Sequence, residues 1–174
     1  MRIIMAMWLC LLLALPAEAF TLDTHRYPGF SVGFPETWIT PFPFKNGPMY
    51  GLESKSPDGQ MWVEVFQVGD RPMPVDTILD EFTESFKTNP QFYPHCRPRH
   101  FTVAGRKAAV RVYSCQRRPN YNWRKYLFGV VETNRGGIMV MGSVADSVVP
   151  SESAYDEDRL ERFLAIVRSV KPVR

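Results

Sequence analysis

The sequence predicts an α+β fold in which a central antiparallel β-sheet is flanked by helices. Three observations lead to this prediction. Segments of alternating apolar residues are joined by short turns, which favours antiparallel pairing. Two other segments carry apolar residues at helical spacing, and each needs a sheet face to bury its stripe. A length of 174 residues with 45% hydrophobic residues allows one domain with a proper core.

The predicted strands begin with a short, half-buried segment over 30–34, followed by a proline-rich loop over 41–48. Strands over 49–54 and 60–68 flank a Pro-Asp-Gly turn, in which proline sets one backbone angle and glycine accepts a positive one. Both faces of the second strand are mostly apolar. This pattern indicates a central strand that is covered on both sides.

Two amphipathic helices complete the predicted fold. The first runs from Pro74 to about Lys87, and the second begins near Ser153. Between them lie a hairpin around residues 104–107 and a second hairpin over 126–144. Because the sheet is apolar on both faces and each helix has one apolar stripe, we expect a helix on each side of the sheet.

The first nineteen residues have the features of a cleaved signal peptide. Arg2 precedes an apolar run over 3–15, and Ala17-Glu18-Ala19 matches the small-x-small cleavage pattern. The run is shorter than the roughly 20 residues that span a bilayer, so an uncleaved anchor is the weaker alternative. We expect a periplasmic or secreted protein without a transmembrane segment after cleavage, consisting of a signal peptide over 1–19, an N-terminal extension over 20–29 and one domain over 30–174.

Cleavage would leave two cysteines, Cys96 and Cys115, in an oxidising compartment, where paired thiols form disulfides. A hairpin turn with Gly105 and Arg106 as its central residues would be of type II′. In the resulting antiparallel register, Cys96 lies opposite Cys115. The sequence therefore predicts a disulfide across this hairpin, which would stabilise the fold by about 3 kcal/mol in the chain-entropy model.

The net charge of +3 hides an uneven distribution of charged residues. Residues 85–131 include ten Lys and Arg but no Asp or Glu. Such a distribution orients a protein toward an anionic partner, while arginine forks bind carboxylates and phosphates and aromatic rings add rigid contact area. The sequence therefore predicts a basic-aromatic docking patch formed by Arg117, Arg118, Tyr121, Trp123, Arg124 and Lys125.

Export makes an acidic protein, a lipid headgroup or a glycan more available to this patch than a nucleic acid. Three more basic residues near the cysteines, Arg97, Arg99 and Arg111, could extend the patch into one continuous face. The alternative is a solvated loop whose Trp123 and Tyr126 pack on the protein's own core.

No catalytic or cofactor-binding signature is present. His95, Cys96 and His100, together with His25, are residue types that bind zinc or copper, but the neighbouring arginines would repel a metal ion. A nucleophile elbow and a phosphate-binding glycine-rich loop are missing. We therefore expect a non-catalytic binding module that uses no cofactor and no metal. A small-ligand carrier or a hydrolase, with a site assembled only in the folded chain, is the alternative.

Three segments point to a known family: FSVGFPETW over 30–38, Gly136-Gly137-Ile138, and RFLAIVRSV over 162–170. In these segments the sequence resembles the PsbP-like superfamily, which includes the photosystem II extrinsic subunit, the Mog-type Ran-binding proteins and DcrB-like bacterial envelope proteins. The resemblance implies an α/β/α sandwich and a binding role. It carries over no catalytic residues.

Overall fold

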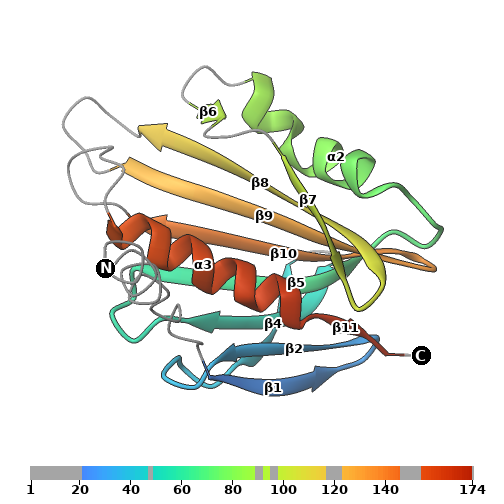
Figure 1. The fold of residues 1–174 in the computed structure, drawn as a ribbon, viewed down its shortest axis with the longest axis horizontal. Coiled ribbons are helices and arrows are strands. Elements are labelled where there is room, and N and C mark those ends of the chain that lie inside the picture. Colours follow the sequence, from blue (N-terminus) through green and yellow to red (C-terminus); the bar gives the residue numbers. More distant parts are fainter. Residues whose placement is uncertain are drawn as a thin grey trace, which may run out of the picture.

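The computed structural model describes residues 21–46, 49–88, 92–94, 98–116, 123–145 and 154–173. Strands take up more than half of these residues, and helices take up less than a quarter (Figure 1). The strands form two antiparallel sheets, one of three strands and one of eight. The prediction of an α+β fold with one helix-flanked central sheet is therefore wrong, because the protein is mostly β and contains a second sheet.

The smaller sheet has the order β1-β2-β11. Strand β1 (Leu22–Tyr27) lies within the predicted N-terminal extension and pairs with β2 (Phe30–Pro35). The short strand β11 (Lys171–Pro172) pairs with the other edge of β2, so the first and the last described strands belong to one sheet. Every residue of β2 is buried, and its phenylalanines belong to the main core.

The larger sheet has the order β3-β4-β5-β10-β9-β8-β6, and β7 also pairs with β8. Its strands are β3 (Phe42–Asn46), β4 (Met49–Lys55), β5 (Met61–Val68), β6 (Phe92–Pro94), β7 (Arg99–Val103), β8 (Arg106–Gln116), β9 (Trp123–Thr133) and β10 (Gly136–Ala145). Strand β3 occupies the predicted proline-rich loop. It is an edge strand, where the missing N–H of Pro43 is tolerated.

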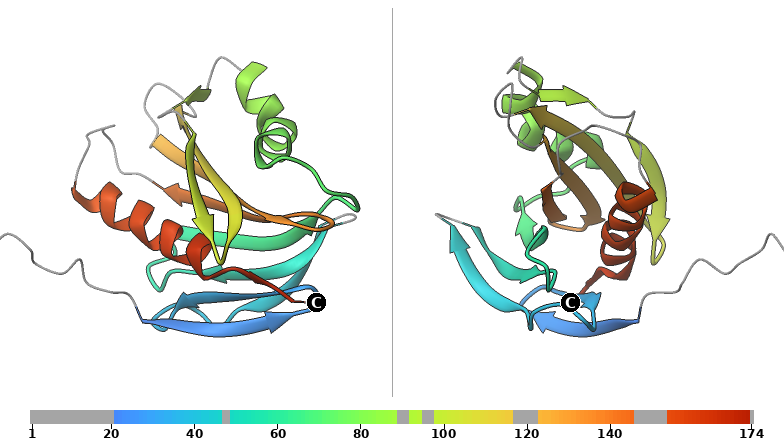
Figure 2. Two further views of the ribbon diagram at one scale, coloured as in Figure 1. Left: turned by 45° about the vertical axis from the view of Figure 1, so that its right-hand side comes forward. Right: turned by 90° about the vertical axis from the view of Figure 1, so that its left-hand side faces the viewer.

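Helix α2 (Val75–Thr88) packs on β8 and β9, and helix α3 (Ala154–Ser169) packs on β2, β9 and β10. The two helices lie on different sides of the curved sheet (Figure 2). Helix α3 shares its side with the smaller sheet, because Phe30 and Phe34 of β2 belong to the same core as Phe163 of α3. The apolar pattern identified buried faces correctly but could not show that a second sheet helps to cover one of them.

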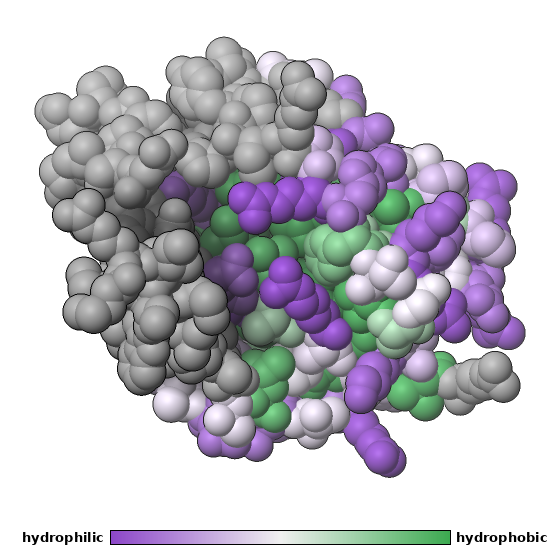
Figure 3. All heavy atoms as spheres, viewed as in Figure 1, coloured by the Kyte–Doolittle hydropathy of each residue, from purple (hydrophilic) through white to green (hydrophobic). Residues whose placement is uncertain are grey.

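The exterior on the α3 side combines hydrophilic side chains with apolar surface visible between them (Figure 3). Within the described ranges, neither helix is long and apolar enough to cross a bilayer. The predicted signal peptide over 1–19 lies outside the described residues.

The β7–β8 hairpin differs from the prediction in its register. Val103 pairs with Arg106, so the two turn residues are Ala104 and Gly105, with φ values of 47° and 78°. Positive φ at both positions defines a type I′ turn, not the predicted type II′ turn. In this register Cys115 lies opposite Phe92. Cys96 lies outside the described residues, so the disulfide stays a prediction. The register that placed Cys96 opposite Cys115 is not the one observed.

Candidate anion-binding site

The predicted docking patch falls largely outside the described residues. Arg117, Arg118 and Tyr121 are not among them, and Trp123 is described as the first residue of β9. Arg124 and Lys125 are consecutive residues of β9, so their side chains point to opposite faces of the sheet. The patch stays a prediction, and its two members with described side chains do not lie on one face.

Arg111 has a structural role that the sequence analysis missed. Its Nη1 atom lies 2.8 Å from Asp80 Oδ1 and donates a second hydrogen bond of 2.8 Å to Thr83 Oγ1. Both partners belong to α2, and the Arg111 side chain is only 11% exposed. This residue therefore fastens α2 to β8 and does not extend a basic docking face.

The two described histidines of the suggested metal site lie in different sheets. His25 lies in β1, with its ring 6.1 Å from that of Phe34, whereas His100 lies in β7, with Nε2 2.8 Å from Asp76 Oδ1. Among the described residues, no group of three or more His, Cys, Asp or Glu side chains could hold a metal ion. His95 and Cys96 lie outside these residues.

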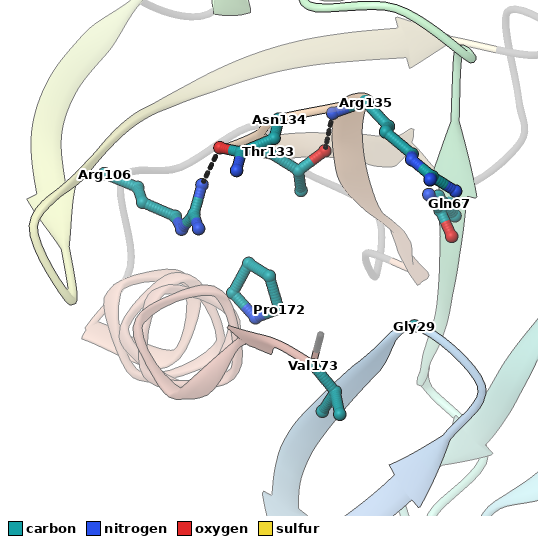
Figure 4. Close-up of a pocket in the computed structure, with 8 residues that line it drawn as sticks. All are labelled: Gly29, Gln67, Arg106, Thr133, Asn134, Arg135, Pro172 and Val173. Carbon is teal, nitrogen blue, oxygen red and sulfur yellow. Dashed lines mark hydrogen bonds between the residues drawn. The ribbon is translucent and has the colours of Figure 1, made fainter.

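A pocket of about 480 Å³ opens where the ends of the two sheets meet (Figure 4). We call it the junction pocket. Its residues come from the β1–β2 turn, from β5, from the β7–β8 and β9–β10 hairpins, and from the C-terminal strand. They are Gly29, Gln67, Arg106, Thr133, Asn134, Arg135, Pro172 and Val173.

Two tight turns bring the arginines of this pocket to the same end of the larger sheet. Arg106 is the first residue of β8, directly after the Ala104-Gly105 turn. Arg135 lies in the turn between β9 and β10, where Thr133 pairs with Gly136. Because β8 and β9 run antiparallel, the start of β8 lies beside the end of β9. Residues 29 positions apart thus come to line one pocket.

The smaller sheet forms the opposite wall of the junction pocket. The Val173 N–H donates a 2.9 Å hydrogen bond to the Gly29 carbonyl, which holds the C-terminal residues beside the β1–β2 turn. Gly29 has a φ of 93°, and a Cβ atom there would lie 2.7 Å from Gln67 Oε1. Glycine therefore serves two needs here, because it accepts the positive φ and leaves space for the Gln67 side chain.

The described lining of the junction pocket is positively charged. Arg106 Nη1 donates a 3.1 Å hydrogen bond to Asn134 Oδ1, and the Arg135 N–H donates a 3.1 Å bond to Thr133 Oγ1. Figure 4 shows the two arginine side chains on different sides of the pocket, with that of Arg135 reaching toward Gln67. No Asp or Glu belongs to its described lining. Two guanidinium groups without a carboxylate between them can bind an anion through charge-assisted hydrogen bonds.

Two other pockets contain both signs of charge. One of about 370 Å³ is lined by Asp76, Glu132, His100 and Lys107, among others. The other, of about 280 Å³, contains Asp58, Asp158, Arg159 and Arg162. In the second pocket, Arg162 Nε lies 2.8 Å from Asp158 Oδ2. These basic groups share their pockets with carboxylates, whereas the described lining of the junction pocket contains none.

An acidic pair lies on strands β4 and β5 of the larger sheet. Glu53 of β4 and Glu64 of β5 occupy directly opposite positions. Burial raises the pKa of Glu64, the charge of Glu53 raises it further, and Lys55 lowers it. Lys55 Nζ lies 2.9 Å from Glu53 Oε1, while Glu64 Oε2 is buried without a hydrogen-bond partner in the described structure.

The sequence analysis counted Arg106 among the basic residues but did not identify Arg135, Asn134 or Gln67 as site residues. Thr133 to Gly137 fall in the middle of the hairpin predicted over 126–144 and are rich in residues that tolerate positive backbone angles. The one available signal was an arginine inside that turn, because a tight turn exposes its side chains at the end of a sheet.

No family model and no curated protein matches this chain. Several solved structures are similar to it. A Bacteroides thetaiotaomicron protein gives a TM-score of 0.46 at 14% identity, covering 83% of this chain and 45% of that one. PA94 of Pseudomonas aeruginosa, a protein of unknown function, gives 0.44 at 14% identity, covering 83% and 94%. LpqN of Mycobacterium tuberculosis, which is involved in cell envelope biogenesis, gives 0.47 at 12% identity, covering 90% and 93%.

This chain thus spans less than half of the length of the Bacteroides protein.

Proposed function

We propose that the protein is an exported, non-catalytic binding module of the cell envelope, which recognises an anionic group of its partner in the junction pocket. One observation carries the proposal: Arg106 and Arg135 line opposite sides of this pocket, and no carboxylate belongs to its described lining. The partner would be an acidic protein, a lipid headgroup or a glycan.

The chemistry of arginine supports anion recognition at this place. A guanidinium group stays charged at every physiological pH and presents a planar fork of donors that matches a carboxylate or a phosphate. The hydrogen bond to Asn134 orients the Arg106 fork before any ligand arrives, which reduces the entropy lost on binding. Because Arg135 is exposed, salt would screen its attraction for an anion.

The composition supports the same proposal. The basic residues of 85–131 have no acidic neighbours in the sequence, and this imbalance would attract anions over a longer range than the pocket itself. The predicted patch around Arg124 and Lys125 remains a second candidate surface for the same partner. Export is proposed from the leader-like residues 1–19.

The test is an NMR titration of the isotope-labelled protein with acetate and, separately, with inorganic phosphate. We expect saturable shift changes of the backbone amides at Gly29, Gln67 and 133–136, and we expect these changes to weaken at high salt. Shift changes confined to residues 117–125 would instead place anion binding at the predicted patch. Absence of saturable changes in both regions would overturn the proposal.

A charge-matched pair of double variants separates the pocket from the general positive field of the protein. Arg106→Gln with Arg135→Gln removes both guanidinium groups of the pocket. Arg99→Gln with Lys107→Gln removes the same net charge from exposed positions outside the pocket's lining. The first pair should abolish the shift changes and the second should leave them. Equal losses in both pairs would contradict a specific site.

A further inference from the structure

The two guanidinium groups of the junction pocket come from different hairpins and do not act as one cluster. Arg106 is held by Asn134 on one side, and Arg135 extends toward Gln67 on the other (Figure 4). Each guanidinium can take one carboxylate in a two-pronged contact. The arrangement therefore offers two separate anion contacts facing one space.

The size of the pocket exceeds what a single small ion needs. A volume of about 480 Å³ lies within the range of roughly 300–1,000 Å³ that is typical of small-molecule pockets. Gln67, Thr133 and Asn134 add uncharged hydrogen-bonding groups to the lining. The space suits a ligand with a body between its charged ends.

The remaining wall is apolar. Pro172 and Val173 line the pocket, and Val173 is 53% exposed. A carbon chain lying between the two arginines would cover this surface and remove it from water. A pyrophosphate group would supply two negative charges but no apolar surface to cover these side chains.

We infer that the anionic group recognised in the junction pocket is a dicarboxylate unit of the partner, with one carboxylate at Arg106, the other at Arg135, and a short apolar spacer against Pro172 and Val173. This inference rests on the proposed function and specifies the ligand of the same site. Two linked contacts bind more tightly than two independent ones, because the second contact forms within a molecule that is already held. A dicarboxylate should therefore bind at least about tenfold more tightly than a monocarboxylate of equal length.

The experiment compares straight-chain dicarboxylates with two to six methylene groups against monocarboxylates of the same length, by NMR titration of the full protein. We expect one spacer length to bind best and every monocarboxylate to bind at least about tenfold more weakly than that optimum. Pyrophosphate is titrated in parallel. If it binds more tightly than every dicarboxylate, or if spacer length has no effect, the inference is wrong.

Single variants provide the matched control. Arg106→Gln and Arg135→Gln should each reduce the affinity for the best dicarboxylate to that of its monocarboxylate. Lys107→Gln, which removes one charge from the residue next to Arg106, should leave the preference intact. The spacer-length series needs no variant, so it stays decisive if a substitution disturbs folding. If acetate binds at the pocket but no dicarboxylate binds better, only the inference fails. If neither acetate nor inorganic phosphate binds at the pocket or at the predicted patch, the proposed function fails as well.

Discussion

The two ends of strand β9 show how differently basic residues can be arranged. At its start, Arg124 and Lys125 are adjacent in sequence, yet the pleat directs them to opposite faces. At its end, Arg135 lies beyond the last residue of the strand and shares a pocket with Arg106, 29 positions earlier in the sequence. High charge density along the sequence thus does not by itself place basic side chains on one face, whereas distant turns can bring two arginines to one pocket.

The strongest test of this comparison removes the positive charges at one end of β9 or at the other. Arg106→Gln with Arg135→Gln should weaken acetate and dicarboxylate binding by at least about tenfold, since both charge-assisted contacts are lost. Arg124→Gln with Lys125→Gln should change the affinity by less than about twofold, through the general field alone. NMR titration measures both. Loss of binding on changing Arg124 and Lys125 alone would reverse the comparison and favour the predicted patch.

Arg111 of β8 lies opposite Phe128, between the two ends of β9. Its charge contacts Asp80 of α2 and so contributes to stability, which distinguishes it from the arginines at either end. Arg111→Ala should lower the free energy of unfolding by about 1–2 kcal/mol, since Thr83 is fully buried and loses its donor. Urea denaturation measures the change, and Arg99→Ala, at an exposed position, serves as the control with an effect under about 0.5 kcal/mol. Weaker anion binding by a folded Arg111→Ala protein would show that this charge also serves recognition.

The turn that positions Arg106 offers a smaller effect. Ala104 has a φ of 47°, a conformation that costs a residue with a Cβ atom free energy and costs glycine little. Ala104→Gly should therefore raise the free energy of unfolding by about 0.5 kcal/mol, and Ala104→Val should lower it. Thermal unfolding of the two variants measures both. Destabilisation by Ala104→Gly would argue against the type I′ turn and for the predicted register.

The smallest effect concerns the acidic pair, which contrasts with the basic ends of the sheet. Because folding raises the pKa of Glu64, its protonated form stabilises the folded state, and this contribution is lost as the pH rises above the ordinary value of 4.5 and through the folded pKa. Glu64→Gln should therefore melt at a higher temperature than the wild type at neutral pH. The difference should vanish below about pH 4. Equal melting temperatures at neutral pH would contradict the pKa shift.

Much of the local structure followed from the sequence. The strand segments over 49–54 and 60–68 were confirmed as β4 and β5, and the turn between them has a positive φ at Gly59, as its glycine predicts. The helix predicted from Pro74 to about Lys87 was confirmed as α2 within one residue. These features depend on side-chain periodicity and turn chemistry, which neighbouring residues determine.

The register of the β7–β8 hairpin shows where such reasoning stops. The predicted and the observed pairings differ by two residues, and a shift of two keeps every side chain on the same face. The apolar pattern is therefore identical in both registers. The choice between them depends on the turn, in which Ala104 adopts a positive φ and so gives type I′ geometry.

The sequence by itself determined most of the longer strands, the two helices and an excess of cations in one stretch of the chain, because each of these depends on neighbouring residues. Only the tertiary structure decided that β1, β2 and β11 would form a second sheet, and that Arg106 and Arg135 would face one pocket. The reason is that pairing between distant strands depends on the packing of the whole core, and the residues of one short segment do not determine that packing.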